Sequence, residues 1–256
     1  MFLGAMLCAA LIGMRLRARL PADHQADPSR EAVLRSLGFV VTLTALVIGF
    51  LVSSAKAYYA DVEQELTEIS SDVAALDRIL EHVGPQAEPA RVRLRQLIGS
   101  AVRTVWPNHA TGLPKGDGAK GLAAIDQLAE AIGAMPAGGA QVSALQSQAL
   151  AYVLAIERSG FKLKRLQEAR AQGPLMAIVV SWLVVIFLGF GLLTPVNQTT
   201  STATILAAFT AAGAMLLILE FYSPVTGIIS IPPSALESAV DLRAEPLPDV
   251  QPPAPR

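Results

Sequence analysis

The sequence has few of the residues that usually build catalytic or metal centres. Its single cysteine, Cys8, excludes an internal disulfide bond and lies in an apolar run at the start of the chain. The three histidines, His24, His82 and His109, lie on separate segments, whereas a metal site needs several converging ligands. No serine–histidine–acid or cysteine–histidine pattern is readable. We therefore expect no enzyme, no catalytic or metal site and no cofactor.

Charge is also scarce. Charged residues make up 16% of the 256 residues, against about 25% in an ordinary soluble domain. The net charge of −1 lacks the basic excess typical of nucleic-acid-binding domains, so we expect no nucleic-acid partner. The shortage is concentrated, because residues 37–55 and 175–219 contain no charged residue at all. Apolar runs of about 18 residues or more indicate membrane helices.

These runs predict an all-α membrane protein with four transmembrane helices, the first one short, and a helical bundle inserted between spans two and three. The opening run, MFLGAMLCAALIGM, is followed by positive charges instead of preceded by them, so we expect a retained helix and not a signal peptide. The predicted boundaries are 1–14 for the first span, 15–36 for a polar link, 37–57 for the second span, 58–172 for the bundle, 175–193 for the third span, 202–220 for the fourth span, 221–239 for an interfacial segment and 240–256 for a disordered proline-rich tail.

The region between spans two and three has the apolar periodicity of amphipathic helices. Val62, Leu66, Ile69 and Val73 recur at spacings of three and four, and neither proline nor glycine separates them from the second span. We predict that this span continues as one helix to Gly84-Pro85. Three further helices are expected: one ending near residue 106, one around residues 122–132 and one from about residue 141 to residue 172. Four such helices with short links favour an antiparallel bundle.

Two stretches resemble the bestrophin-like domain family of bacterial and plant membrane proteins. One is SLGFVVTLTALVIGFLVSSAKAYYADVEQELTEIS, where the second span runs into an acidic stalk. The other is LEFYSPVTGIISIPPSALESAV, where an acidic residue, a proline, a glycine and a short β-branched run follow the last span. The resemblance covers nearly the whole chain and implies the architecture. Bestrophins themselves are pentameric anion channels with a cytosolic helical region, so the resemblance also implies an oligomeric, ion-channel-like protein.

Positive charges give two conflicting indications of the side of the membrane on which the bundle lies. Lys162, Lys164, Arg165 and Arg170 precede the third span and favour a cytoplasmic bundle, because positive charges near span ends stay inside. The link at residues 15–36 carries five arginines and favours the opposite orientation. The resemblance to bestrophins favours a cytoplasmic bundle. We expect an integral protein of the bacterial inner membrane.

Five polar residues are candidates for pore or gating roles: Thr42, Thr44, Ser53, Ser54 and Glu220. Hydroxyl groups on a span can line a conduction path, but they also bond to the carbonyl groups of their own helix. If Glu220 lies in the middle of the membrane, its charge indicates a functional role. Because aromatic residues and a proline follow it at once, it is also consistent with a residue at the membrane border.

Two further sets of residues predict contacts with lipid and with other helices. The basic cluster of Lys162, Lys164, Arg165 and Arg170 is suited to anionic lipid headgroups. In the last span, small residues allow close helix packing, either within one subunit or between subunits of a homo-oligomer. These small residues are Ala207, Ala208, Ala211 and Ala212.

Two functions follow from these patterns. The first is an oligomeric ion-channel-like or transport-related protein, with the lipid bilayer and further copies of the chain as its partners. The alternative is a membrane sensor or scaffold, whose bundle binds a ligand or partner outside the cytoplasm and signals through helix shifts.

Overall fold

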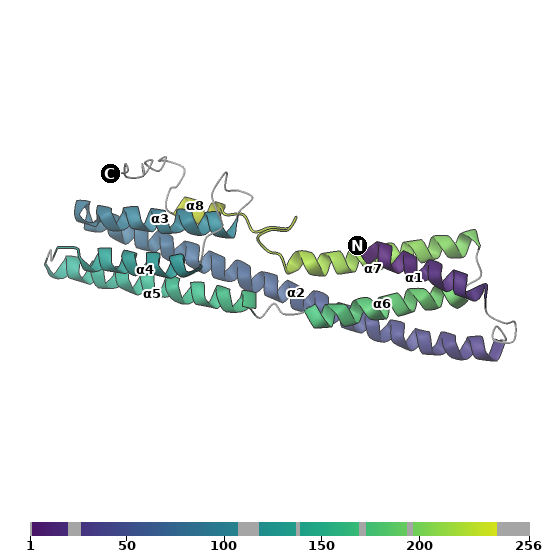
Figure 1. The fold of residues 1–256 in the computed structure, drawn as a ribbon. Coiled ribbons are helices and arrows are strands. Elements are labelled where there is room, and N and C mark those ends of the chain that lie inside the picture. The colour runs from purple at the N-terminus through teal and green to yellow at the C-terminus, as the bar shows by residue number, and fades with distance from the viewer. Residues whose placement is uncertain are drawn as a thin grey trace, which may run out of the picture. The chain divides into compact units, whose positions relative to one another are not determined.

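The computed structural model describes residues 2–19, 27–106, 118–136, 139–168, 173–193 and 197–239, and contains helices but no strand within these ranges (Figure 1). Its helices are α1 (Phe2–Arg17), α2 (Asp27–Val83), the short 3₁₀-helix η2 (Pro85–Ala87), α3 (Glu88–Val105), α4 (Gly118–Gly133), α5 (Ala140–Glu168), α6 (Gly173–Leu193), α7 (Gln198–Phe221) and α8 (Ser234–Ala239).

The chain divides into two compact units. The membrane unit comprises Met1–Tyr59 and Ala169–Ser223, and the bundle unit comprises Ala60–Glu168 and Pro224–Arg256. Helix α2 contributes its first part to the membrane unit and its second part to the bundle unit. Gly84 ends this helix with a backbone φ of 89°, a conformation that glycine adopts without strain.

Three of the described helices are long and apolar enough to cross a membrane. They are the apolar part of α2, α6 and α7, in which only 17%, 28% and 17% of the most apolar 18-residue window is buried. Helix α1 is also apolar, but its 16 residues are short for a span. The protein is therefore membrane-embedded, and a fourth span remains a prediction.

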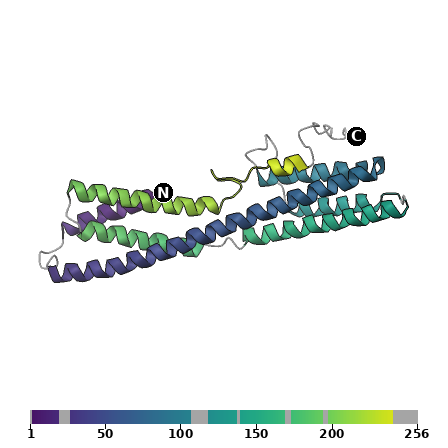
Figure 2. The same cartoon turned by 180° about the vertical axis from the view of Figure 1, so that it is seen from behind.

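The core of the membrane unit lies where α1, α6, α7 and the first part of α2 meet. It combines small residues such as Ala9 and Ala10 with larger ones, among them Met6, Phe187 and Tyr222. Helices α1 and α6 run side by side in the same direction in both views (Figures 1 and 2). Helix α7 begins at a capping box, in which Asn197 and Thr200 each accept a hydrogen bond from the backbone N–H of the other.

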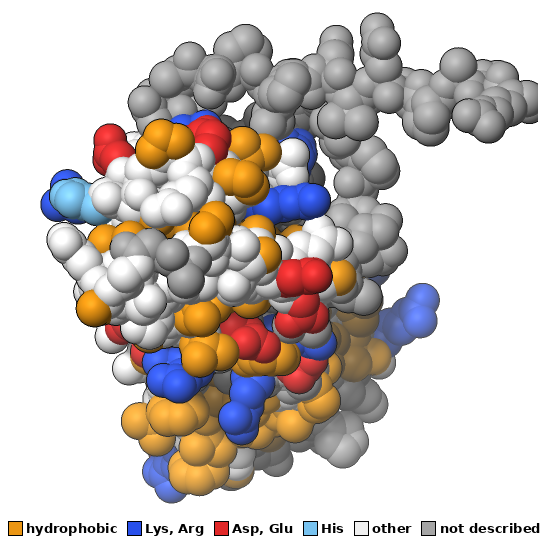
Figure 3. All heavy atoms as spheres, turned by 90° about the vertical axis from the view of Figure 1, so that its left-hand side faces the viewer, with side chains coloured by type: hydrophobic (Ala, Val, Ile, Leu, Met, Phe, Trp, Pro, Cys, Tyr) orange, Lys and Arg blue, Asp and Glu red, His pale blue; other side chains and the backbone are white. Residues whose placement is uncertain are grey.

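In the bundle unit, α3, α4, α5 and the second part of α2 bury the apolar faces that the sequence periodicity marks. Side chains buried to at least 97% occur on every one of these helices: Val62, Val73, Leu76, Leu80, Leu94, Ile98, Leu128, Ile132 and Val153. Helix α8 packs against α3. Acidic and basic side chains are interspersed on the end of this unit that faces the viewer in Figure 3, as expected of a surface in water.

Candidate functional site

In the membrane unit, exposed side chains form a continuous stripe along one side of α2. Phe39, Leu46 and Phe50 are 71%, 71% and 67% exposed, and the hydroxyl residues Thr42 and Ser53 lie at the same helical spacing between and after them. Residues spaced by three and four occupy one face of a helix. The two hydroxyls and three large apolar side chains therefore share one uncovered face of this unit.

The other two hydroxyls predicted for a pore lie on a different side of α2. Thr44 is 2% exposed and donates a hydrogen bond to the carbonyl oxygen of Val40 at 2.7 Å. Ser54 is half-buried, and its Oγ lies 3.5 Å from the hydroxyl of Tyr222. Thr42 also donates to its own helix, to Gly38 at 2.9 Å. The structure thus separates an open pair, Thr42 and Ser53, from an inward pair.

Aromatic rings of α2 and α7 gather where α7 ends. The ring centres of Tyr58 and Tyr222 are 5.4 Å apart, and those of Tyr59 and Phe221 are 5.8 Å apart. Tyrosine side chains are typical of membrane–water interfaces. Glu220 is half-buried in the last turn of α7, directly before these rings. Its place in the chain therefore fits the border of the membrane better than its centre.

The four alanines predicted for helix contacts on α7 differ in their surroundings. Ala208 is fully buried in the core of the membrane unit, Ala211 packs against that core, Ala212 is half-buried and Ala207 is exposed. Contact within one chain thus accounts for Ala208, whereas a role of Ala207 between subunits remains a prediction.

Helices α1 and α6 approach each other closely at two glycines that were not among the predicted contact residues. A Cβ atom added at Gly13 would overlap the backbone oxygen of Leu188, and one added at Gly191 would overlap the backbone oxygen of Ala10. Two glycines on facing helices let the backbones touch, as small residues do between membrane helices.

The basic cluster before the third span contains one residue with a fixed partner. Lys162 on α5 donates to Oε1 of Glu65 on α2 at 2.5 Å. Lys164 and Arg165 are exposed, and Arg170 lies outside the described residues. Contact of Lys164 and Arg165 with lipid headgroups remains a prediction.

Glu65 is the partner that the sequence analysis missed. Its side chain is 8% exposed, and its second oxygen, Oε2, is buried without a hydrogen-bond donor among the described residues. The hydrogen bond and the charge of Glu65 raise the pKa of Lys162. Farther along α2, burial and then the charge of Glu68 raise the pKa of Asp72. Along α2, the carboxylate of Glu65 is therefore buried, that of Asp72 is half-buried and that of Glu68 is exposed.

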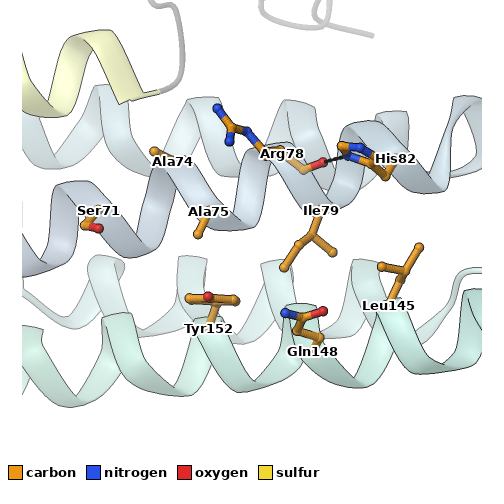
Figure 4. A pocket seen from close by; sticks show the side chains of 9 residues that line it. All are labelled: Ser71, Ala74, Ala75, Arg78, Ile79, His82, Leu145, Gln148 and Tyr152. Atoms are coloured by element: carbon orange, nitrogen blue, oxygen red, sulfur yellow. Dashed lines mark hydrogen bonds between the residues drawn. The ribbon is translucent and has the colours of Figure 1, made fainter.

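A shallow cavity of about 530 Å³ lies between α2 and α5 in the bundle unit (Figure 4). Apolar side chains of Ile79 and Leu145 line it together with Gln148 and Tyr152. At one end, Nδ1 of His82 donates to the carbonyl oxygen of Arg78 at 2.7 Å. The volume is in the range of small-molecule pockets. Among the described residues, no cluster of three or more histidines, cysteines and acids could hold a metal ion.

Comparison with known proteins gives a family and a fold. Residues 4–236 match the family model of the Bestrophin-like domain. A variant of a bacterial bestrophin homologue from Klebsiella pneumoniae superposes with a TM-score of 0.68 at 13% identity, over 95% of this chain and 99% of that chain. A second variant of it gives 0.66 at 13% identity over 93% and 95%. A structure described as a membrane protein gives 0.67 at 13% identity over 94% and 96%. No curated protein matches the chain.

Proposed function

The chain belongs to the bestrophin-like domain family, and on this premise we propose that it is an oligomeric, ion-channel-like protein of the bacterial inner membrane. Its bundle unit lies on the cytoplasmic side in this proposal. The path for ions lies between copies of the chain, along the open face of α2. The fold shared with bacterial bestrophin homologues supports the architecture, and the membrane unit supports the location of the path.

The observation that carries the proposal is the open face of α2. On this face, two hydroxyl groups interrupt the apolar side chains of Phe39, Leu46 and Phe50, and a single chain leaves the face uncovered. A helix face that contacts only lipid would not need these hydroxyl groups. In an oligomer assembled around this face, the same face of each neighbouring subunit would line a shared central path. Hydroxyl groups and apolar constrictions are both used to line conduction paths. Thr42 and Ser53 are therefore the pore residues of the proposal.

Assembly is supported by how little of each span one chain buries. In α2 and in α7, 17% of the most apolar window is buried. Ile205, Leu206 and Phe209 on α7 are between 55% and 67% exposed, close to the exposed Ala207. Such surfaces must face lipid or another subunit. We assign the open face of α2 to the pore and part of α7 to the contact between neighbouring subunits.

The test is ion flux combined with cysteine accessibility. In a Cys8→Ala background, Ser53→Cys and Thr44→Cys are reconstituted separately into liposomes, and chloride and potassium efflux are followed. A bulky, membrane-impermeant methanethiosulfonate is expected to reduce efflux through Ser53→Cys and to leave Thr44→Cys unchanged, because Thr44 is buried within the chain. Efflux no greater than from empty liposomes, for the unsubstituted chain under every ionic condition, would reject the proposal.

The second candidate is a sensor, and the unbroken course of α2 favours it. This helix links a membrane span to the bundle unit without a break, so a shift along it could carry a signal between the two. The sensor requires the bundle outside the cytoplasm. Ala134→Cys, at an exposed position of the bundle unit, distinguishes the two. Labelling by an impermeant maleimide only after cell lysis favours the channel, and labelling of intact cells favours the sensor.

A further inference from the structure

The most exposed large apolar side chain in the described residues lies outside the spans. Ile228 is 90% exposed and its neighbour Ile229 is 45% exposed. The other large apolar side chains that are more than 60% exposed all lie on the apolar part of α2 or on α7: Phe39, Leu46, Phe50, Leu206 and Phe209. Ile228 is therefore more exposed than the uncovered side chains of the spans, although it lies outside them.

The loop that carries these isoleucines is held at its base. The N–H of Ile231 donates to the carbonyl oxygen of Pro224 at 2.8 Å, which closes the segment 224–231. The indole Nε1 of Trp106 donates to the carbonyl oxygen of Ile231 at 2.7 Å, and Trp106 itself is only 2% exposed. Hydrogen bonds thus hold both ends of this segment, and Ile228 lies between them. We call residues 225–230 the loop tip.

The position of the loop tip in the chain indicates what covers it. Helix α7 ends at Phe221, within the group of aromatic rings typical of a membrane interface, and only Tyr222 and Ser223 separate it from Pro224. A chain extends at most about 3.6 Å per residue. Ile228 thus lies within about 25 Å of the end of the span, by a path of seven residues.

The composition of the loop tip favours lipid over a charged partner. Residues 221–236 contain no charged side chain. Within the tip, two isoleucines are flanked by the hydroxyl residues Thr226 and Ser230, so an apolar centre has a polar margin. Apolar side chains beside hydroxyls suit the boundary between headgroups and acyl chains, where both kinds of group are solvated.

We infer that the loop tip is a membrane anchor, in which Ile228 and Ile229 insert into the headgroup–acyl boundary of the leaflet where α7 ends. Through Trp106, the anchor ties α3 of the bundle unit to the bilayer surface. The inference depends on α7 lying in the membrane and is independent of ion conduction. Because the tip carries no basic residue, its insertion does not require anionic lipid.

The test measures how deeply a label at the loop tip lies. In a Cys8→Ala background, the full chain with Ile228→Cys is labelled with a nitrobenzoxadiazole fluorophore and reconstituted into phosphatidylcholine vesicles. The same label at Leu154→Cys is the matched control, because Leu154 is an apolar residue of the bundle unit that is 58% exposed and far in sequence from any span. Quenching is compared for aqueous iodide and for lipids with a nitroxide at carbon 5 of the acyl chain.

The expected result is several-fold stronger quenching by nitroxide lipid at position 228 than at position 154, with the reverse order for iodide. Adding phosphatidylglycerol should leave the lipid quenching at 228 unchanged. Ile229→Ser, introduced beside the label, should make the label shallower if the two isoleucines insert together. Iodide quenching at 228 equal to that at 154 would overturn the inference, since the tip would then lie in water. Protection from both quenchers would also overturn it, by showing that protein covers the tip.

Discussion

The membrane unit and the bundle unit are held together by different kinds of contact. In the membrane unit, facing glycines bring two backbones together, and apolar rings and methyl groups fill the rest. The bundle unit has a core of buried leucines and isoleucines, and it also contains ion pairs and a buried tryptophan that donates a hydrogen bond. Lipid is as apolar as a leucine side chain, so helices within it gain little from apolar burial and depend on close fit. In water, burial itself stabilises the bundle.

The largest effect is expected from breaking the close fit at Gly191. Gly191→Ala would place a methyl group against the backbone of Ala10, and a backbone cannot move aside as a side chain can. We expect the free energy of unfolding to fall by about 3 kcal/mol or more, the upper part of the range for overpacking. Titration of the purified protein with dodecyl sulfate, followed by circular dichroism, measures this change.

Gly4→Ala is the matched control on α1. Nothing lies within 4 Å of a Cβ atom at Gly4. Alanine is favoured over glycine inside a helix by roughly 0.5–1 kcal/mol, so this variant should be unchanged or slightly more stable. An equal loss at both positions would show that close approach is not what holds α1 against α6.

The next effect concerns the bundle unit, at Trp106. Trp106→Phe keeps an aromatic ring but removes the Nε1 donor to Ile231, so a carbonyl group loses its partner. We expect a loss of about 1–3 kcal/mol, the usual cost of an unsatisfied buried polar group. Thermal unfolding monitored by circular dichroism tests this, and Trp182→Phe, at a half-buried position on α6 in the membrane unit, is the control. A larger loss for Trp182→Phe than for Trp106→Phe would contradict the anchoring role of this hydrogen bond.

Local patterns in the sequence predict the helices of both units well. The stripe that begins at Val62 predicts one helix up to Gly84-Pro85, and α2 ends at Val83. The last helix of the bundle was expected from about residue 141, and α5 begins at Ala140. Its expected end at residue 172 lies outside the described residues. These features depend on periodicity and on glycine or proline at helix ends, which are readable without knowing the fold.

Contacts between distant residues could not be predicted in the same way. Glu65 and Lys162 are 97 positions apart, and Trp106 and Ile231 are 125 apart. Glu65 lies three residues after Val62 and four before Ile69, and Asp72 lies at the same spacing between Ile69 and Leu76. This position on the apolar stripe was a usable signal for burial. For Gly13 and Gly191 no comparable signal exists, because glycine is common in membrane helices and only the pairing makes it important.

A smaller effect is expected where the bundle unit depends on charge. Lys162→Met leaves the buried carboxylate of Glu65 without its partner, which is unfavourable in a poorly solvated place. We expect lower stability at neutral pH for Lys162→Met and little change for Lys164→Met, whose side chain is exposed. The double variant with Glu65→Gln should recover part of the loss. Unfolding curves for the four proteins test this, and equal effects at both lysines would contradict the role of the pair.

The same pair predicts how stability depends on alkaline pH. The pKa of Lys162 is raised in the folded chain, so the folded state holds this proton more tightly than the unfolded state. The stabilisation is complete below the ordinary lysine pKa of about 10.4 and is lost as the pH rises through the higher folded value. Lys162→Met should remove this part of the pH dependence. An unchanged alkaline profile in the variant would assign the loss of stability to other groups.

The smallest effect is expected for Asp72→Asn, which should raise the free energy of unfolding at neutral pH, whereas Lys162→Met should lower it. Because burial and Glu68 raise the pKa of Asp72, the folded chain binds its proton more tightly than the unfolded chain. The contribution of this one group to stability is therefore greatest below the ordinary aspartate pKa of about 3.9 and falls as the pH rises through the raised value. At neutral pH, Asp72→Asn removes a charge that the fold disfavours, and the free energy of unfolding should rise slightly, by less than Lys162→Met lowers it.

Two variants separate the causes of this gain. Glu68→Gln removes the second cause of the shift, so it should lower the pKa of Asp72 and flatten the pH dependence without abolishing it, because burial remains. Asp61→Asn removes the same charge at an exposed position on α2 and should not stabilise the chain. Equal gains at positions 61 and 72 would mean that the net charge of the bundle unit controls its stability. A gain at Asp72 alone would show that individual burial decides which charges the water-exposed unit tolerates, just as individual contact decides which glycines the membrane unit requires.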